Sequence, residues 1–527
     1  MYAYRTATQS PRDRKFASPS DEIRIAVTFK RPDGSPGPTK YAPPMSLSAV
    51  PHFVPDPLMV EKGIFELHKL GFRLTQRGPM SVSMRCTRKL FESTFGTRLS
   101  PIKLDSKEDY VFQSFFFPAQ GAPWKPMPTV ADTIDDAYIQ WPHIYMGKKR
   151  PVRPGGAPVR TPTKRSLPKV STDSDLSNVS ATPPHVGYYH LEMPDGVPGL
   201  LNVKQVHQAG TTGAGVRVVM IDSGFAHSHP FFVAHGFRST VDLAPRAIND
   251  KTDPNGHGTG ESTNLFAVAP GITFIGIKLD HDGDPRSGAT ILEGFQQALQ
   301  HQPQVISVSL GFDLRTNGKQ SAVLPSSLAA LEAEVQAAVA KGIIVVFSAG
   351  NGHFSFPGMM PDVISAGGVF VAKDGSMRAS DYASAFPSKI YPGRFVPDFS
   401  GLVGMQPHAS YIMLPVPPGS EIDHETSRPD DGRPGDGTAP DDGWGVFSGT
   451  SAAAPQLAGV CALLLQKNPG LTPSDIKAVL RRTARTVSTG AANPSSSDGG
   501  VGEPASESDT GAAGAGLVDA FEAWQQV

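Results

Sequence analysis

The stretch Phe447-Ser-Gly-Thr-Ser-Ala-Ala-Ala-Pro455 decides how the rest of this sequence is interpreted. It places a small hydroxyl residue, Ser451, where a glycine-containing turn enters the apolar run 460–465, which predicts a buried helix. Small neighbours would let a peptide backbone approach the Ser451 hydroxyl, and the helix N-terminus offers partial positive charge to a developing anion. A serine that merely caps a helix has the same pattern. A catalytic role therefore requires a base and an acid elsewhere in the chain.

Composition limits the classes of protein that the chain can belong to. Its 527 residues, 39% hydrophobic and 18% charged, predict a sizeable core in about two domains. A net charge of −1 gives no overall field for nucleic acid or an anionic membrane. The two cysteines, Cys86 and Cys461, lie in different predicted domains, so we expect neither a disulfide nor a metal site.

No targeting segment is visible at the N-terminus. The first ten residues lack an apolar stretch behind their basic residue, and no run approaches the roughly 18 apolar residues of a membrane span. We therefore expect a cytoplasmic protein, with leaderless export left open. We expect no membrane or nucleic-acid partner and no cofactor.

The first 146 residues predict a disordered start (1–20) and a small α+β module (21–146). Alternating apolar residues predict a strand over 22–29, and helical spacing over 58–70 ends at Gly71. Strands are expected over 72–77 and 80–85, a helix between Thr87 and Gly96, and a strand in 109–118. The order β-α-β-β-α-β suggests a ferredoxin-like module, which by itself indicates no function.

Beyond the module the composition changes twice. Residues 147–185 are basic and Pro-rich without apolar periodicity, which predicts a flexible, cleavable linker. From 186 to 527, continuous apolar strands alternate with helices, so the fold class is α/β, with a parallel sheet covered by helices on both faces. Sites in such sheets lie at the carboxyl ends of the strands. Strands are expected over 216–221, 305–310 and 343–347, and Asp222, Leu310-Gly311 and Gly350-Asn351 lie at or just after their ends.

Three further residues supply what Ser451 needs. Asp222 follows an apolar strand in Met220-Ile-Asp-Ser-Gly224, and His257 lies between glycines in Asn255-Gly-His-Gly-Thr-Gly260. An aspartate can orient the imidazole and stabilise its cation while the histidine takes the serine proton. Asn351 can offer its side-chain amide to a tetrahedral oxyanion.

These motifs resemble the active-site signatures of subtilisin-like serine proteases, the subtilase family. Asp-Ser-Gly at Asp222, Gly-His-Gly-Thr at His257, Ser-Ala-Gly-Asn at Asn351 and Gly-Thr-Ser-Ala-Ala-Ala-Pro at Ser451 match in the family's order. The resemblance covers about residues 200–527. It implies a serine endopeptidase that acts on proteins or peptides through an acyl-enzyme, with these four residues as its catalytic group.

The resemblance also implies substrate contacts. Two segments would form the walls of the specificity pocket, a serine would form its floor, and residues 283–288 would pair with the substrate upstream of the cut. The implied wall and floor residues are Ser309, Leu310, Gly311, Ser348, Ala349, Gly350 and Ser355. A small floor without an acid predicts cleavage after medium or large apolar side chains. The loop that commonly holds calcium in the family is missing, so no metal is expected.

Two other segments follow from the same resemblance. Subtilases are commonly made with a ferredoxin-like prodomain, and phrases at 70–72 and 91–99 also look like prodomains of the related sedolisins. We therefore expect the module to inhibit the protease in cis until the linker is cut. The Asp/Gly/Pro-rich insertion 423–443 is expected to be a solvated loop. A catalytically silent binding protein and a non-peptidase acyl hydrolase remain as alternatives.

Overall fold

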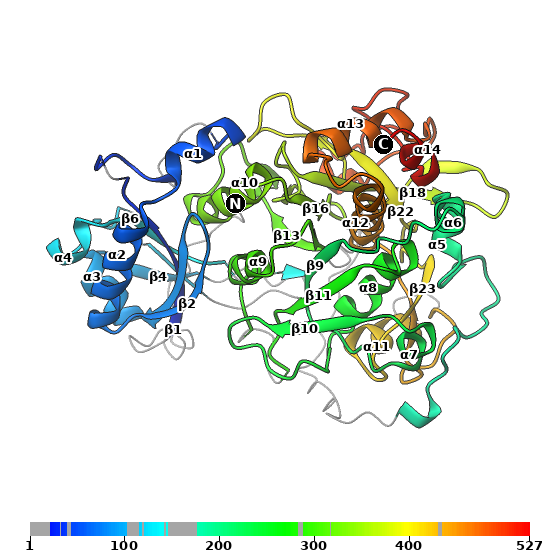
Figure 1. Ribbon diagram of the computed structural model, residues 1–527, viewed down its shortest axis with the longest axis horizontal. Coiled ribbons are helices and arrows are strands. Elements are labelled where there is room, and N and C mark those ends of the chain that lie inside the picture. Colours follow the sequence, from blue (N-terminus) through cyan, green and yellow to red (C-terminus); the bar gives the residue numbers. More distant parts are fainter. Residues whose placement is uncertain are drawn as a thin grey trace, which may run out of the picture.

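The computed structural model describes residues 22–31, 33–38, 44–102, 115–118, 121–141, 144–145, 176–282, 288–316, 318–429 and 435–527. The predicted disordered start (1–20), most of the predicted linker (147–175) and residues 283–287 of the predicted substrate-pairing segment lie outside these ranges. We call residues 22–141 the N-terminal module and residues 176–527 the C-terminal domain (Figure 1).

The C-terminal domain is built on a mainly parallel sheet. Among the described residues its strands follow the order β10-β11-β9-β12-β16-β18-β19, and β22 also pairs with β18. Only β19 runs antiparallel to its neighbour in this described sheet. The strands are β9 (Arg217–Asp222), β10 (Ser239–Leu243), β11 (Thr273–Lys278), β12 (Val305–Val308), β16 (Ile344–Ser348), β18 (Ile364–Val371), β19 (Met377–Ala379) and β22 (Phe399–Leu402).

Helices cover both faces of this sheet, as the continuous apolar strands predict (Figure 1). Along β9, Val218 and Met220 join the core that contains α8 (His257–Val268) and α12 (Thr450–Lys467). Val219 and Ile221 join the opposite core, with α9 (Ile291–Gln300) and α10 (Ala329–Ala340). Side chains on a strand point alternately to the two faces, so burial on both sides requires an unbroken apolar run.

The remaining elements of the C-terminal domain are shorter. Its other helices are α5 (Gly196–Leu200), α6 (Val203–Gln208), α7 (Pro230–His235), α11 (Glu421–Ser427), α13 (Pro473–Thr483) and α14 (Ala520–Gln525). Its other strands are β8 (Leu191–Glu192), β13 (Leu310–Asp313), β14 (Arg315–Thr316), β15 (Lys319–Gln320), β17 (Ser355–Phe356), β20 (Phe386–Pro387), β21 (Phe395–Val396), β23 (Ile412–Pro415) and β24 (Trp444–Val446).

The N-terminal module is an antiparallel sheet of order β2-β3-β1-β6 with helices packed on it. Thr87 accepts a hydrogen bond from the Leu90 N–H and caps α3, and left-handed Gly71 and Gly96 end α2 and α3, as the sequence predicts. The elements are β1 (Glu22–Phe29), α1 (Val50–Phe53), α2 (Pro57–Leu70), β2 (Arg73–Arg77), β3 (Val82–Thr87), α3 (Arg88–Phe95), β4 (Leu99–Ile102), β5 (Phe115–Pro118), α4 (Pro128–Ala131) and β6 (Ile134–Ile139).

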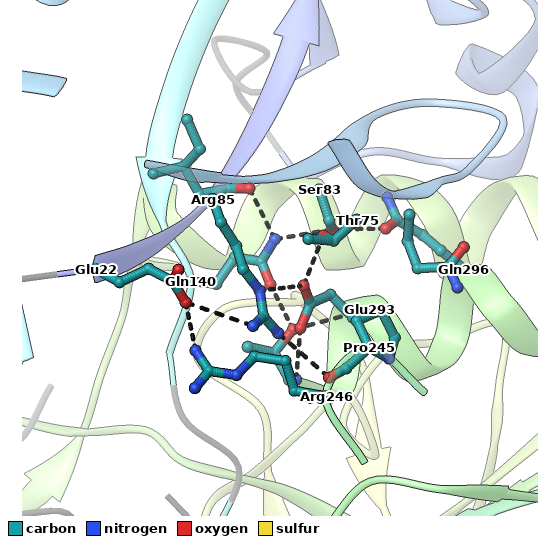
Figure 2. Close-up of polar contacts among 12 residues, drawn as sticks. Glu22, Thr75, Ser83, Arg85, Gln140, Pro245, Arg246, Glu293 and Gln296 are labelled. Atoms are coloured by element: carbon teal, nitrogen blue, oxygen red, sulfur yellow. Dashed lines mark hydrogen bonds and ion pairs between the residues drawn. The ribbon is translucent and has the colours of Figure 1, made fainter. Parts of the chain in front are cut away.

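The sheet of the N-terminal module packs on α9 and α10 through polar side chains (Figure 2). We call this the helix contact. Glu293 of α9 accepts a 2.6 Å hydrogen bond from Thr75, and Gln296 accepts one of 2.6 Å from Ser83. Further polar pairs are Gln76 with Gln297, Ser81 with Glu334, Gln140 with Thr290, and Arg85 with the Pro245 carbonyl. A small apolar cluster of Met45, Ala49, Val50, Phe53, Met80, Ala333 and Ala337 lies beside them.

Three sequence-based expectations need correction. The last strand of the module's sheet is β6 and not the run 109–118, whose described part forms β5 and pairs with β4. The strand expected over 305–310 is divided: β12 ends at Val308, and β13 begins at Leu310 in a different sheet. The insertion 423–443 is not simply a solvated loop in its described part. Asp423 is fully buried at the start of α11, and Asp436 accepts a hydrogen bond of 2.9 Å from the Val446 N–H. Backbone N–H groups engage these carboxylates and allow their burial.

Candidate active site

Asp222 and His257 meet at the carboxyl end of β9. Asp222 is the last residue of that strand, and His257 is the first residue of α8. The Asp222 Oδ1 lies 2.7 Å from the His257 Nδ1, and the aspartate is completely buried. An N–H at Nδ1 donating to this carboxylate leaves Nε2 available as a base.

A second buried aspartate holds the loop that carries His257. Asp253 accepts hydrogen bonds from the Ser223 hydroxyl (2.8 Å), from the Thr259 N–H (2.9 Å) and hydroxyl (2.7 Å), and from the Gly256 N–H (3.0 Å). A Cβ on Gly258 would lie 2.3 Å from the Gly224 carbonyl, so the loop approaches β9 this closely only with glycine there. The loop is therefore fixed against the strand that supplies Asp222.

Ser451 lies in the first turn of α12, at the end nearest His257. The helices α8 and α12 run side by side in the same direction, since contacts link Gly260 with Phe447, Asn264 with Gln456, and Gly459 with Val268. Ser451 is 4% exposed, and its backbone carbonyl accepts a 2.8 Å hydrogen bond from Ser309. The predicted nucleophile thus lies where a helix N-terminus faces the predicted base.

Asn351 is held next to this turn by Thr450. Its Oδ1 accepts hydrogen bonds of 2.9 Å from both the N–H and the hydroxyl of Thr450. A Cβ on Gly449 would lie 2.6 Å from the Asn351 Nδ2, so the amide nitrogen lies directly against the turn before Ser451. Thr450 therefore engages the acceptor end of the amide, and the donor nitrogen lies beside Gly449.

The predicted wall and floor residues also lie together. Strand β17, which contains Ser355, pairs with β13, which contains Leu310 and Gly311. The Ser355 hydroxyl donates to the Ser348 carbonyl at 3.3 Å, and a Cβ on Gly350 would lie 3.2 Å from the Ser355 Cβ. Ala349, which lies between Ser348 and Gly350 in the sequence, is fully buried. Of the predicted pairing segment 283–288, only Gly288 is described.

A short strand from the N-terminal half already pairs with this wall. Strand β7 (Ile144–Tyr145) runs antiparallel to β13, with Tyr145 opposite Leu310 and Ile144 opposite Gly311. We call this the cleft contact. The chain that leaves the N-terminal module therefore occupies the strand edge at which the sequence predicts that substrate binds.

The electrostatics of the site centre on His257. Burial opposes the imidazolium, but Asp222 above all, with smaller contributions from Glu261 and Asp253, outweighs burial and raises the pKa of His257 to about 9. Burial raises the pKa of Glu261 to about 8, although His257 and Asn264 act in the opposite direction. Inspection of the sequence missed Glu261, Asp253 and Thr450. The proximity of Glu261 to His257 could have been predicted, because Glu261 lies four residues after His257 and a helix there places both side chains on one face.

The described part of the chain contains no cluster of three or more His, Cys, Asp or Glu that could hold a metal ion. Its helices include none that is long and apolar enough to cross a membrane. Both cysteines, Cys86 and Cys461, are buried and free.

Comparison with known proteins assigns the chain to a family. The model of the subtilase family matches residues 213–503, more than half of the chain, and this range contains Asp222, His257, Asn351 and Ser451. The chain belongs to the subtilase family. It is a subtilisin-like serine endopeptidase with a mainly parallel central sheet.

Individual subtilases are similar to this chain in sequence or in structure. The chain is 27% identical to subtilisin NAT of Bacillus subtilis subsp. natto over 342 residues, which cover 62% of this chain and 75% of that protein. It is 30% identical to the serine protease AprX of Bacillus subtilis over 319 residues, 53% of this chain and 64% of AprX. The crystal structure of fervidolysin from Fervidobacterium pennivorans, a keratinolytic enzyme related to subtilisin, matches with a TM-score of 0.51 at 17% identity. That match covers 96% of this subtilase and 61% of fervidolysin, and it supports the fold alone.

The relatives overturn one expectation. The absence of a visible signal peptide led to the prediction of a cytoplasmic protein, but the matched subtilisins are secreted enzymes, and the prediction is wrong.

Proposed function

We propose that this subtilase hydrolyses peptide bonds through an acyl-enzyme on Ser451, with His257 as base, Asp222 as its orienting acid and Asn351 as oxyanion donor. The observation that carries the proposal is the 2.7 Å contact between the Asp222 Oδ1 and the His257 Nδ1 in a fully buried setting. That contact fixes the tautomer in which Nε2 accepts a proton.

Each group then has one task. The His257 Nε2 takes the Ser451 proton as the oxygen attacks the scissile carbonyl, and Asp222 stabilises the resulting imidazolium. The oxyanion develops at the N-terminus of α12, where the Asn351 amide nitrogen lies against Gly449. The imidazolium next protonates the leaving amine, and water releases the acyl group by the same steps in reverse.

The pocket supports a preference for apolar side chains before the scissile bond. In this proposal Ser309, Leu310 and Gly311 form one wall, Ser348, Ala349 and Gly350 the other, and Ser355 the floor. The pairing of β17 with β13 and the contacts of Ser355 with Ser348 and Gly350 support it. No acid stands among these positions, so a basic side chain would find no counter-charge. A peptide panel cut only after Lys or Arg would contradict this preference.

The same geometry supports inhibition in cis by the N-terminal module, as a prodomain. The helix contact positions the module, and the cleft contact occupies the edge of β13 that a peptide substrate would use. The predicted linker 147–185 follows β7 in the sequence and leads into the C-terminal domain. A cut within this linker would let the module and β7 leave together. We propose that the enzyme itself makes this cut.

A fluorophosphonate probe tests the proposed chemistry. Wild-type protein is expected to be labelled covalently and to cleave casein, whereas Ser451→Ala is expected to do neither. The two alternatives give other outcomes: a silent binding protein would remain unlabelled, and a non-peptidase acyl hydrolase would be labelled yet leave casein intact.

Intact-mass analysis tests self-processing. The wild-type chain is expected to lose mass as it is cut within 147–185, and Ser451→Ala is expected to keep its full length. Equal, full-length masses for both proteins under active conditions would contradict self-cleavage.

A further inference from the structure

The imidazole of His257 lies between two carboxyl groups. Asp222 holds Nδ1 at 2.7 Å, and the Glu261 Oε1 lies 4.0 Å from Nε2. Glu261 is one turn further along α8 and is 1% exposed. It therefore stands beside the nitrogen that receives the Ser451 proton in the proposed reaction.

A chain of amides fixes the orientation of the Glu261 carboxyl. Its Oε2 accepts a 3.0 Å hydrogen bond from Asn264, whose Oδ1 accepts one of 3.1 Å from Gln456 of α12. Gln456 is held in turn by both backbone groups of Leu402 in β22, at 2.7 and 3.2 Å. The helix that carries Ser451 thus also fixes Glu261, and the carboxyl cannot turn away without breaking this network.

We propose that Glu261 is a positioning residue that acts on the His257 imidazole as a second carboxyl partner at Nε2. The inference rests on the proposed function, because it concerns the base in that reaction. When the His257 Nε2 takes the Ser451 proton, the imidazole becomes positively charged, and the buried Glu261 Oε1 lies 4.0 Å from that nitrogen. In a buried setting, a charge pair at this distance interacts strongly.

The surrounding ionisable groups are few. Asp222 of β9 and Asp253 of the preceding loop face His257, and Asp222 also acts on Glu261. The facing turns of α12 contribute Ser451 and Gln456, and β23 and α5, which also pack on α8, contain no acidic or basic residue. His227 hydrogen-bonds to Ser262 on α8, and burial lowers its pKa to about 3, so it stays neutral.

Glu261 and His257 therefore titrate as a coupled pair. When Glu261 and His257 share one proton, the ionised Glu261 carboxylate favours the state in which the imidazole carries that proton. A protonated His257 cannot act as the base. Replacing Glu261 by the neutral isostere Gln removes that stabilisation. Proton loss from His257 then requires less alkaline conditions, and the acidic limb of activity moves to lower pH.

The test compares the rate constants of Ser451 labelling by a fluorophosphonate in the full-length wild type and in Glu261→Gln between pH 5 and pH 10. The ratio of the two rate constants cancels any pH dependence of module opening, since the helix contact is the same in both proteins and each rate is taken while the intact mass shows an uncut chain. We expect the ratio of variant to wild type to rise about tenfold from pH 10 to pH 6, equivalent to a limb shift of about one pH unit. A ratio that stays flat across this range would overturn the inference.

Two measurements keep the outcome interpretable. If Glu261→Gln does not fold, Glu261→Asp is measured instead; it withdraws the carboxyl by one methylene, and a smaller rise in the same direction is expected, again overturned by a flat ratio. Ser451→Ala separates the two proposals. Persistent labelling of Ser451→Ala defeats the proposed function, whereas labelling confined to Ser451 with a flat ratio defeats only the role of Glu261.

Discussion

The helix contact and the cleft contact join the same N-terminal half to the C-terminal domain, but they are built from different groups. The helix contact uses buried side chains, among them Glu334, which accepts a 2.6 Å hydrogen bond from Ser81. The cleft contact is a backbone pairing of Ile144 and Tyr145 with β13. Side-chain contacts can be specific to one partner, whereas backbone pairing accepts any extended chain. We infer that the helix contact gives the module its affinity and the cleft contact gives inhibition.

The helix contact is most sensitive at Gly78, where the module comes closest to α10. A Cβ there would lie 2.2 Å from the Glu334 Oε1, which is already engaged by Ser81 and Met80, and Gly78 does not have a left-handed backbone. Gly78→Ala should therefore weaken docking by about 1–3 kcal/mol without straining the module itself. Hydrogen-exchange protection of α10, measured in the uncleavable Ser451→Ala background, should fall about 5- to 150-fold.

A double-mutant cycle controls this prediction. In a Glu334→Ala chain, Gly78→Ala should have little further effect, because the obstructing carboxyl is gone. Equal losses of protection with and without Glu334 would mean that Gly78 acts through the fold of the module and not through the helix contact.

The helix contact should also weaken as the pH rises. Burial raises the pKa of Glu334 to about 7, although hydrogen bonds from Ser81 and Gln296 oppose the shift. When the module leaves, the exposed carboxyl should return to about 4.3. The docked form holds the proton more tightly, so docking is favoured below the free value and loses this contribution as the pH rises to about 7.

Protection factors of α10 in the Ser451→Ala background measure this loss. They should fall about tenfold between pH 6 and pH 8, and Glu334→Gln should remove most of the dependence. A fall of the same size in Glu334→Gln would assign the pH response to another group.

The cleft contact should respond to changes of backbone and not of side chain. Tyr145→Pro removes a backbone N–H from β7 and disfavours its pairing with Leu310, whereas Tyr145→Ala leaves the backbone intact. Loss of one hydrogen bond corresponds to about a two- to tenfold faster labelling of Ser451. Protection of α10 should remain unchanged. If Tyr145→Pro instead released the helix contact, the two contacts would not be separable as we infer.

An exposed ion pair at the border of the helix contact gives the smallest expected effect. Glu22 pairs with Arg246, and both side chains are 44% exposed. Such pairs contribute at most about 1 kcal/mol, so Arg246→Ala should change α10 protection by no more than about fivefold. A larger loss would mean that the helix contact depends on charge at its border as well as on its buried centre.

The sequence is informative where function depends on a few consecutive residues. Asp222, His257 and Asn351 are candidates on sequence grounds because each ends or follows a strand, or begins a helix, within a short glycine-containing motif, and their catalytic roles stay predictions. Helix ends were equally local: Thr87 and Gly96 mark α3, and the structure confirms both. In these cases the interactions that determine the local structure, such as a helix cap, are made by residues that are close together in the sequence.

What could not be predicted depends on distant partners. The spacing of Glu261 from His257 is local, but the orientation of its carboxyl depends on Asn264 and, through it, on Gln456, almost two hundred residues later. Gly78 is close-packed only because Glu334 lies against it. The buried aspartates of the 423–443 insertion looked solvated because their hydrogen-bond donors, such as the Val446 N–H, reach them only in the folded chain. Burial of polar groups is decided by tertiary packing, which periodicity along the chain does not report.

The most direct test of the central claim, that the module covers a nucleophilic Ser451, is the initial fluorophosphonate labelling rate of the chain, measured while its intact mass shows that the linker is uncut. We predict slow labelling of the wild type, labelling faster by about fivefold or more in Gly78→Ala, and none in Ser451→Ala. Labelling of Gly78→Ala at the wild-type rate, in protein whose α10 protection has fallen, would show that undocking the module does not uncover the serine and would contradict the account.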